Sequence, residues 1–256
     1  MHWDTLTRDF LMQREERKIS IQESKFEEEV EAQSGCFPGN TLVFDISGSK
    51  FISDVKIGDM LSTTCGFSSV YLLAHVDADA VSIFVEITTD SKHTVQLSPF
   101  HYITANGKDS LAKDVKLGDN ITVRANNIRN NVTNTNIYYT SMITLVRNVD
   151  NIGLYSPFTT CGDIEVASAN SNTTSSGIIA SIYSDWFLED VGINPAKIPS
   201  IYHLLLAPLR FIHHIQPMWT THFASYFESS TDSLHKHGTC TLLLAGLSAT
   251  CGLLGF

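Results

Sequence analysis

Charge is scarce outside the first 35 residues, and several patterns that define large protein classes are missing. Residues 1–35 carry 14 of the 44 charged side chains, so the remaining 221 residues carry only 30. No two of the five cysteines form a C-x-x-C pair, and none has zinc-finger spacing to a histidine pair, so no metal site is expected. A net charge of −10 and a pI near 5.4 argue against a nucleic-acid partner.

The amino-terminal residues turn charged before any apolar run of signal-peptide length, so no secretory signal is visible. The chain is then either not secreted as written or a fragment of a longer precursor. Sequons at Asn131 and Asn172 nevertheless hint at a secretory history. The odd number of cysteines leaves at least one thiol outside any intrachain pair. Because 43% of the residues are apolar, the chain can bury a sizeable core.

Between residues 36 and 186 the sequence consists of short segments rich in β-branched and aromatic residues. Turn signals built from Gly, Asn, Asp and Ser separate these segments, and no helical periodicity lies between them. The expected strands are 41–46, 51–55, 70–76, 82–89, 94–98, 101–105, 120–125, 136–146 and 178–184. This density of strands predicts an all-β domain.

An internal repeat lies inside this β region. The segment DVKIGDML at 54–61 recurs as DVKLGDNI at 114–121, and at the same offset of 60 residues 41–45 fall on residues 101–105. Two copies are too few for a solenoid, so they predict a pseudo-twofold β domain made from a duplicated subdomain. Cys36 lies just before the first copy and His101 opens the second. These two residues are the candidates for chemistry at a shared centre.

The two ends of the chain differ from the β region. Residues 1–35 form a charged arm, of which residues 5–33 read as a solvent-exposed helix or a partly disordered segment. After residue 186, apolar positions at helical spacing are interrupted by prolines, which predicts short kinked helices. The last 19 residues, 238–256, carry no charge. A membrane span, a membrane-surface or lipid-handling helix, and a plain core helix remain open for this segment.

Four sequence blocks together resemble the hedgehog C-terminal autoprocessing domain, a member of the Hint (hedgehog/intein) superfamily. GCFPG at 35–39 is similar to the start of that domain, and LSPFH at 97–101 is similar to its Leu-Thr-Pro-x-His block. GLYSPFT at 153–159 resembles the family's Gly-x-x-x-Pro-Leu-Thr block, and IASIY at 179–183 falls where the family has Ala-Ser-Cys-Tyr. The blocks occur in the family's order and cover residues 36–186.

This resemblance implies an all-β Hint fold, a pseudo-twofold β horseshoe, followed by a helical, apolar C-terminal extension. The implied parts are an arm at 1–35, an autoprocessing domain at 36–186, and a sterol-recognition-like helical region with an apolar tail at 187–256. Residues 203–216 look like the family's sterol-recognition segment. Two positions depart from the family pattern, since Ser98 replaces a threonine and Ile182 replaces a cysteine.

Cleavage at Gly35-Cys36 is the expected reaction. A cysteine thiol is a strong nucleophile, and Gly35 has no side chain to shield its carbonyl from attack by Cys36. The leaving amide nitrogen needs a proton, which a histidine such as His101 can both accept and donate near neutral pH. Ser98 is expected to hold the site by hydrogen bonds. The products would be residues 1–35 with a C-terminal ester or acid, and residues 36–256 with an amino-terminal cysteine.

The resemblance also implies what resolves the thioester. In the family an aspartate after an apolar strand activates a sterol hydroxyl, and Asp77 is the residue that fits best, with Asp79 as the alternative. A sterol such as cholesterol is thus the co-substrate that the resemblance implies, and no cofactor or metal is expected. The family resemblance places the chain in the secretory pathway or at a membrane, with residues 238–256 as a possible membrane contact.

Other functions remain open. Thioester hydrolysis by water needs no lipid, and a non-enzymatic membrane-associated protein with a relic Hint domain needs no chemistry. Full protein splicing is disfavoured because the chain contains no His-Asn dipeptide, which splicing requires at its downstream junction. A cysteine protease acting on other chains is less expected, because the nucleophile directly follows a glycine at the end of the arm.

Overall fold

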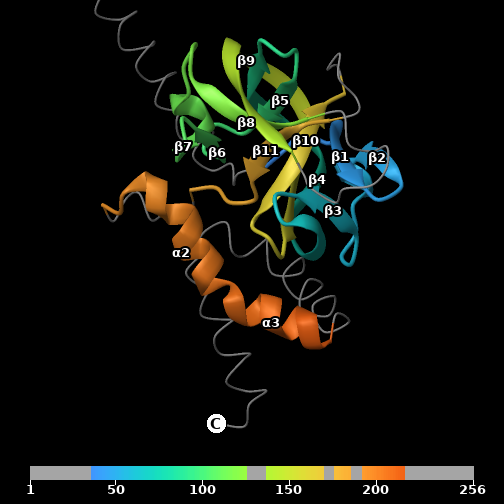
Figure 1. Ribbon diagram of the computed structural model, residues 1–256. Helices are drawn as coiled ribbons and strands as arrows, with labels where there is room; N and C mark the ends of the chain where they lie inside the picture. Colours follow the sequence, from blue (N-terminus) through green and yellow to red (C-terminus); the bar gives the residue numbers. More distant parts are fainter. Residues whose placement is uncertain (1–35, 126–136, 170–175, 186–191, 217–256) are drawn as a thin grey trace, which may run out of the picture. The chain divides into compact units, whose positions relative to one another are not determined.

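The computed structural model describes residues 36–125, 137–169, 176–185 and 192–216 (Figure 1). Its strands are β1 (Thr41–Asp45), β2 (Gly48–Phe51), β3 (Met60–Thr63), β4 (Gly66–Thr89), β5 (Thr94–Leu97), β6 (Tyr102–Ala105), β7 (Lys108–Leu111), β8 (Asn120–Arg124), β9 (Tyr138–Thr159), β10 (Asp163–Ser168) and β11 (Ile178–Ser181). Its helical elements are the 3-10 turns η1 (Ile52–Asp54), η2 (Ala112–Asp114) and η4 (Pro195–Lys197) and the α-helices α2 (Ile198–Leu205) and α3 (Ala207–Ile215).

The strands form one 11-stranded sheet in the order β11-β10-β1-β3-β4-β9-β8-β6-β7, with β2 on β1 and β5 on β4. Strand β11 also pairs with β8, so the sheet closes on itself. Every strand pairing recorded in the described residues is antiparallel. The predicted all-β class is therefore confirmed.

The two longest strands, β4 and β9, form an extended antiparallel pair (Figure 1). Their pairing runs from Val70 opposite Thr159 to Thr89 opposite Ile143, with four register irregularities on the way. The predicted separate strands at 70–76 and 82–89 are thus one strand of 24 residues. Since β-branched and aromatic side chains dominate both segments, the chain stays extended through the irregularities.

The duplication read from the sequence is present in the backbone. Strands β1 and β2 form one hairpin and β6 and β7 form the other, and a 3-10 turn follows each. Asp45 pairs with Leu61 in the first copy, and Ala105 pairs with Ile121 in the second, at the same offset of 60 as the sequence repeat. Each copy therefore folds back on its own first strand in the same register.

The DVK-apolar-GD segments form matching turns. In the first copy the backbone N–H of Lys56 donates to Asp59 Oδ2 over 2.7 Å, and in the second Lys116 donates to Asp119 Oδ2 over 2.8 Å. The glycine of each turn has a positive φ, 94° at one and 91° at the other. The predicted strand at 51–55 was wrong, because residues 52–54 form η1, which leads into this turn.

A hydrophobic core lies inside the closed sheet. It includes Phe37 from the start of the described chain and side chains from both copies. The largest fully buried side chains of the described residues are Tyr71, Tyr102, Tyr183, Tyr202, Phe37, Phe44, Phe84 and Phe158. Burying each such aromatic side chain contributes on the order of 1.5–3 kcal/mol, so the core determines where the strands sit.

The predicted short kinked helices are confirmed. Leu206 separates α2 from α3, and Pro208 lies in the first turn of α3, where a missing N–H costs little. Tyr202 of α2 packs against Tyr183 with ring centroids 6.2 Å apart, which docks the helix on the β domain. No helix of the described residues is long and apolar enough to cross a membrane. The apolar segment 238–256 and the predicted domain boundaries at 35–36 and 186–187 reach outside the described residues, and both stay predictions.

Candidate active site

The described chain begins with an antiparallel β-bridge between Phe37 and Tyr155 of β9. Phe37 exchanges two backbone hydrogen bonds with Tyr155, of 2.9 and 3.0 Å. Two glycines allow the segments to approach closely: a Cβ on Gly153 would lie 3.1 Å from the backbone nitrogen of Gly39 and 2.8 Å from the Tyr155 ring. Gly153 also has a φ of 89°, which favours glycine. Cys36 is thus fixed by backbone pairing on its carboxyl-terminal side.

Cys36 is fully buried and keeps its thiol. Its side chain belongs to a small apolar cluster with Phe84 of β4 and Leu154 of β9. These apolar side chains separate the Cys36 sulfur from bulk solvent. A thioester formed there would be shielded from adventitious hydrolysis.

Ser98 binds the backbone of Cys36 on both sides. The Cys36 N–H donates to Ser98 Oγ over 2.8 Å, and the Ser98 N–H donates to the Cys36 carbonyl over 3.0 Å. Ser98 is itself fully buried. The Cys36 nitrogen belongs to the predicted scissile bond with Gly35, so the Ser98 hydroxyl lies at the atom that cleavage would release.

His101 follows Ser98 by one tight turn, in which its N–H donates to the Ser98 carbonyl over 3.0 Å. Its imidazole is fully buried and lies edge-on to the Phe37 ring, with centroids 4.4 Å apart. Nε2 lies 2.7 Å from the Ser181 carbonyl oxygen. Because a carbonyl only accepts, Nε2 carries the proton, and Nδ1 is the atom of the neutral ring that can take up another.

Asp77 lies next to the apolar cluster formed by Cys36, Phe84 and Leu154. It is the register partner of Leu154, which packs against Cys36. Its carboxylate is exposed, and its Oδ1 accepts hydrogen bonds of 3.0 Å from the backbone N–H groups of Asp79 and Ala80. These bonds close a small loop at a register irregularity between β4 and β9.

The structure thus brings Cys36, Ser98 and His101 together. Ser98 is hydrogen-bonded to both Cys36 and His101, and Phe37, next to Cys36, contacts the His101 ring. The structure connects Asp77 to the same place through Leu154. Gly35, the other half of the predicted scissile bond, lies outside the described residues. The catalytic roles of all these residues stay predictions.

Comparison with known proteins identifies the family. The model of the Hint module family matches residues 27–236, which is more than half of the chain. The chain belongs to the Hint module family. This confirms the resemblance to the hedgehog-type autoprocessing domain and the Hint fold, and it supports self-processing as the general chemistry of the chain.

Two curated relatives are Warthog proteins of Caenorhabditis elegans. Warthog protein 6 is 31% identical over 152 residues, which make up 54% of this chain and 24% of that protein. Warthog protein 1 is 25% identical over 143 residues, or 51% of this chain and 27% of that protein. The match therefore spans about a quarter of each relative's length.

Solved inteins are similar at low identity. The gp41-1 intein has 16% identity and a TM-score of 0.43, with 58% of this chain and 99% of the intein covered. The Ssp DnaB mini-intein variant M86 has 11% identity and a TM-score of 0.46, with 60% and 96% covered.

Sequence reasoning missed the group that holds the histidine of this Hint module. The acceptor of the His101 Nε2 proton is the backbone carbonyl of Ser181, at the end of β11. A carbonyl has no sequence signature, although the IASIY block that contains it was one of the four resemblances. The sequence also left the cysteine pairing open, whereas the structure joins Cys65 to Cys161.

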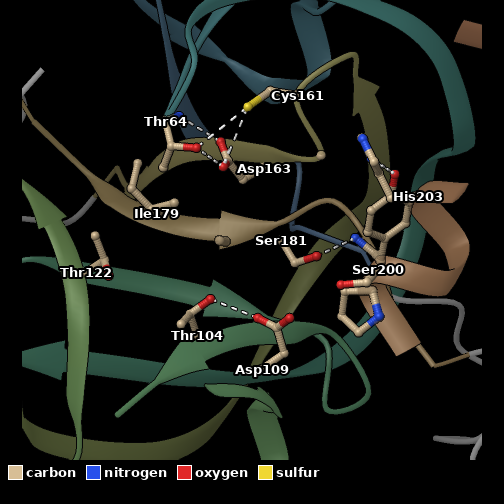
Figure 2. Close-up of a pocket in the computed structure, with 14 residues that line it drawn as sticks. Thr64, Thr104, Asp109, Thr122, Cys161, Asp163, Ile179, Ser181, Ser200 and His203 are labelled. Atoms are coloured by element: carbon tan, nitrogen blue, oxygen red, sulfur yellow. Dashed lines mark hydrogen bonds between the residues drawn. The ribbon is translucent and has the colours of Figure 1, made fainter. Parts of the chain in front are cut away.

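A cavity of about 390 Å³ lies beyond Ser181, between the sheet and α2 (Figure 2). Burial raises the pKa of both carboxyl groups that line it, Asp109 and Asp163. Burial, together with the positive charge of Arg210, lowers the pKa of His203 at its rim. Within the described residues, no group of three or more His, Cys, Asp or Glu side chains is placed to hold a metal ion.

Proposed function

We propose that the chain cleaves itself between Gly35 and Cys36 by an N-to-S acyl shift, and that a sterol hydroxyl or water then resolves the thioester. The observation that carries this proposal is the bond between the Cys36 nitrogen and Ser98 Oγ. It places a hydroxyl on the leaving nitrogen, in the same turn that carries His101. A buried cysteine with a merely structural role would not need that arrangement.

In the first step Cys36 Sγ attacks the Gly35 carbonyl carbon. His101 Nδ1 takes the thiol proton and delivers it to the Cys36 nitrogen as the carbon–nitrogen bond breaks. The Nε2–H bond to Ser181 keeps the ring in the tautomer that leaves Nδ1 basic. The Ser98 hydroxyl orients the leaving nitrogen, and the products are a thioester at Gly35 and an amine on Cys36.

In the second step an acceptor hydroxyl attacks the same carbonyl carbon. Asp77 Oδ1 is engaged by two backbone N–H groups, which orients the carboxylate so that Oδ2 takes the hydroxyl proton. The carbon–sulfur bond breaks, the Cys36 sulfur regains a proton, and residues 1–35 leave as an ester or acid. Asp79 remains the alternative base, and the variants Asp77→Asn and Asp79→Asn distinguish the two.

Two features support an acceptor with an apolar body. Val81 and Ile152 are register partners beside the Asp77 loop, and they are 70% and 57% exposed. Val76, which directly precedes Asp77 in the sequence, is 45% exposed. A sterol presents a hydroxyl at one end of an apolar body, so it fits an exposed carboxylate beside an apolar surface. The resemblance of residues 203–216 to a sterol-recognition segment supports the same co-substrate.

Water is the second candidate acceptor, because the Asp77 carboxylate is exposed to solvent. Hydrolysis would release residues 1–35 as the free acid, with the same first step. A relic domain that only anchors the chain to membranes is less well supported, since Ser98 is hydrogen-bonded to both Cys36 and His101, and Phe37 contacts the His101 ring. Flotation of Cys36→Ala protein with vesicles tests anchoring independently of cleavage.

Intact-mass measurement tests the proposal. Purified chain is incubated with hydroxylamine, which leaves disulfides intact, with cholesterol in detergent micelles, or with neither. We expect residues 1–35 as the hydroxamate in the first arm and as the sterol ester in the second. Cys36→Ala should stay whole in every arm. Cleavage by hydroxylamine without ester formation would leave self-processing standing and exclude the sterol, whereas an uncleaved wild-type chain would overturn the proposal.

A further inference from the structure

The disulfide Cys65–Cys161 joins two turns that are distant in sequence, because its half-cystines are 96 positions apart. Cys65 lies in the turn between β3 and β4, and Cys161 lies in the turn between β9 and β10. Cys65 is exposed and Cys161 is half-buried at the cavity, beside Thr64 and Asp163 (Figure 2). A reductant can therefore reach this bond in the folded chain, whereas Cys36 is fully buried.

The turn that carries Cys161 is bonded directly to the end of β11. The Gly162 carbonyl accepts a 3.2 Å hydrogen bond from the Ile182 N–H, and Asp163 is the register partner of Ser181. Thr64, beside Cys65, donates its backbone N–H to Asp163 Oδ1 over 2.8 Å. Both sides of the disulfide thus converge on the strand pair that ends at Ser181.

Ser181 is the residue that fixes His101. Its carbonyl accepts the Nε2 proton over 2.7 Å, and its hydroxyl accepts the Tyr183 N–H over 3.0 Å. The Tyr183 carbonyl in turn accepts the Tyr102 N–H over 3.0 Å, next to His101 in sequence. A shift of the β10–β11 end would therefore displace the His101 imidazole, whose own residue is hydrogen-bonded to Ser98, the residue that binds the Cys36 nitrogen.

We propose that the Cys65–Cys161 disulfide is a positioning element for His101, and that its reduction slows the N-to-S acyl shift. This inference rests on the proposed function. Reduction breaks the sulfur–sulfur bond with two electrons and two protons, giving two thiols and freeing the turn at 160–163. Because disulfides persist in oxidising compartments, cleavage would be fastest there and slow in a reducing one.

Cleavage rates with and without the disulfide test this inference. Uncleaved chain is mixed with excess hydroxylamine, which captures the thioester, with and without a phosphine reductant that is not a thiol. We expect reduction to slow the first-order cleavage about tenfold or more, as small misplacements of catalytic groups do. The variant Cys65→Ser/Cys161→Ser should be equally slow and insensitive to the phosphine. Reoxidation should restore the rate of the wild type only.

A second readout separates positioning from stability. In a Cys36→Ala background, the hydrogen-bonded Nε2 proton of His101 should give an imidazole NMR signal that weakens or disappears on reduction. Val55→Ala, in the first copy and away from β11, serves as a control destabilised to a matched extent in urea. It should keep both the signal and the rate.

An unchanged rate and an unchanged His101 signal after reduction would overturn the inference, as would equal slowing in Val55→Ala. Failure of the proposed function looks different, because oxidised wild-type chain would then resist hydroxylamine altogether. The NMR arm uses a chain that cannot cleave. It therefore reports on the link between the disulfide and His101 in either case.

Discussion

The two copies of the duplicated subdomain share a backbone and differ in chemistry. The turn before β1 is closed by a 2.9 Å bond from the Thr41 N–H to the Pro38 carbonyl, and the turn before β6 by a 3.0 Å bond from His101 to Ser98. The four positions correspond at the offset of 60. One turn thus holds the Ser98 hydroxyl and the His101 imidazole, whereas its counterpart holds a proline and a threonine at the equivalent positions. The two copies therefore share their backbone, and we expect the residues of the second turn, rather than those of the first, to take part in cleavage at Cys36.

Substitutions at equivalent residues of the two copies should give the largest difference in cleavage rate. We expect His101→Ala to slow cleavage in hydroxylamine by about 10²–10⁴-fold, because the leaving nitrogen loses its proton donor. Thr41→Ala, at the equivalent position, should leave the rate within a few-fold of wild type. Timed intact-mass spectra of both variants provide the measurement. Equal losses would mean that the turn conformation, not the imidazole, governs the reaction.

Ser98 variants test the role of the hydrogen bond that this residue accepts from Cys36. In Ser98→Ala the Cys36 N–H loses its 2.8 Å acceptor. If the cost of about 1–3 kcal/mol for an unsatisfied buried donor falls on the transition state, cleavage slows by roughly five- to 150-fold. Ser98→Thr keeps the hydroxyl and should cleave at a rate close to wild type. A slow threonine variant with an active alanine variant would show that the side-chain volume matters and the hydrogen bond does not.

The structural equivalence of the two copies is tested at the turn glycines Gly58 and Gly118. Gly58→Ala and Gly118→Ala each place a Cβ in open space but force a positive φ on alanine, at a cost of about 1–2 kcal/mol in unfolding free energy. Urea unfolding should show equal destabilisation, with cleavage rates unchanged below the transition. A large difference between the two variants would contradict the structural equivalence of the copies.

A smaller effect concerns a second buried histidine, His93, between β4 and β5. Its ring nitrogens contact Ser91 Oγ and Ser176 Oγ, and burial lowers its pKa below 6.5, although the negative charge of Glu165 opposes the shift. The unfolded chain then binds more protons than the folded chain just below pH 6.5. The free energy of unfolding should therefore reach its full value above pH 6.5 and decrease as the pH falls below it.

Urea unfolding of Cys36→Ala protein at a series of pH values measures this dependence. Burial also lowers the pKa of His203 and His213, so both add to the same trend. The raised pKa values of Asp109 and Asp163 act in the opposite direction at lower pH. His93→Gln should flatten the profile near pH 6, and an unaltered slope would exclude His93 as a contributor.

The sequence predicted the features that local patterns encode. The repeat, the all-β class, the kinked helices and the meeting of Cys36 with Ser98 and His101 follow from short motifs in order along the chain. Strand β10, the joining of 66–89 into one strand and the Cys65–Cys161 pairing depend on partners far away in sequence, so no local signal marked them. The Ser181 carbonyl escaped notice because a backbone atom carries no residue identity.

The most direct test of self-cleavage through Cys36 is the mass of the fragments that hydroxylamine releases from the wild-type chain. We expect two products from the wild-type chain, residues 1–35 as a C-terminal hydroxamate and residues 36–256 with an amino-terminal cysteine. We expect no fragments from Cys36→Ala. A wild-type chain that stays whole, or a cut at any other bond, would contradict self-cleavage through Cys36.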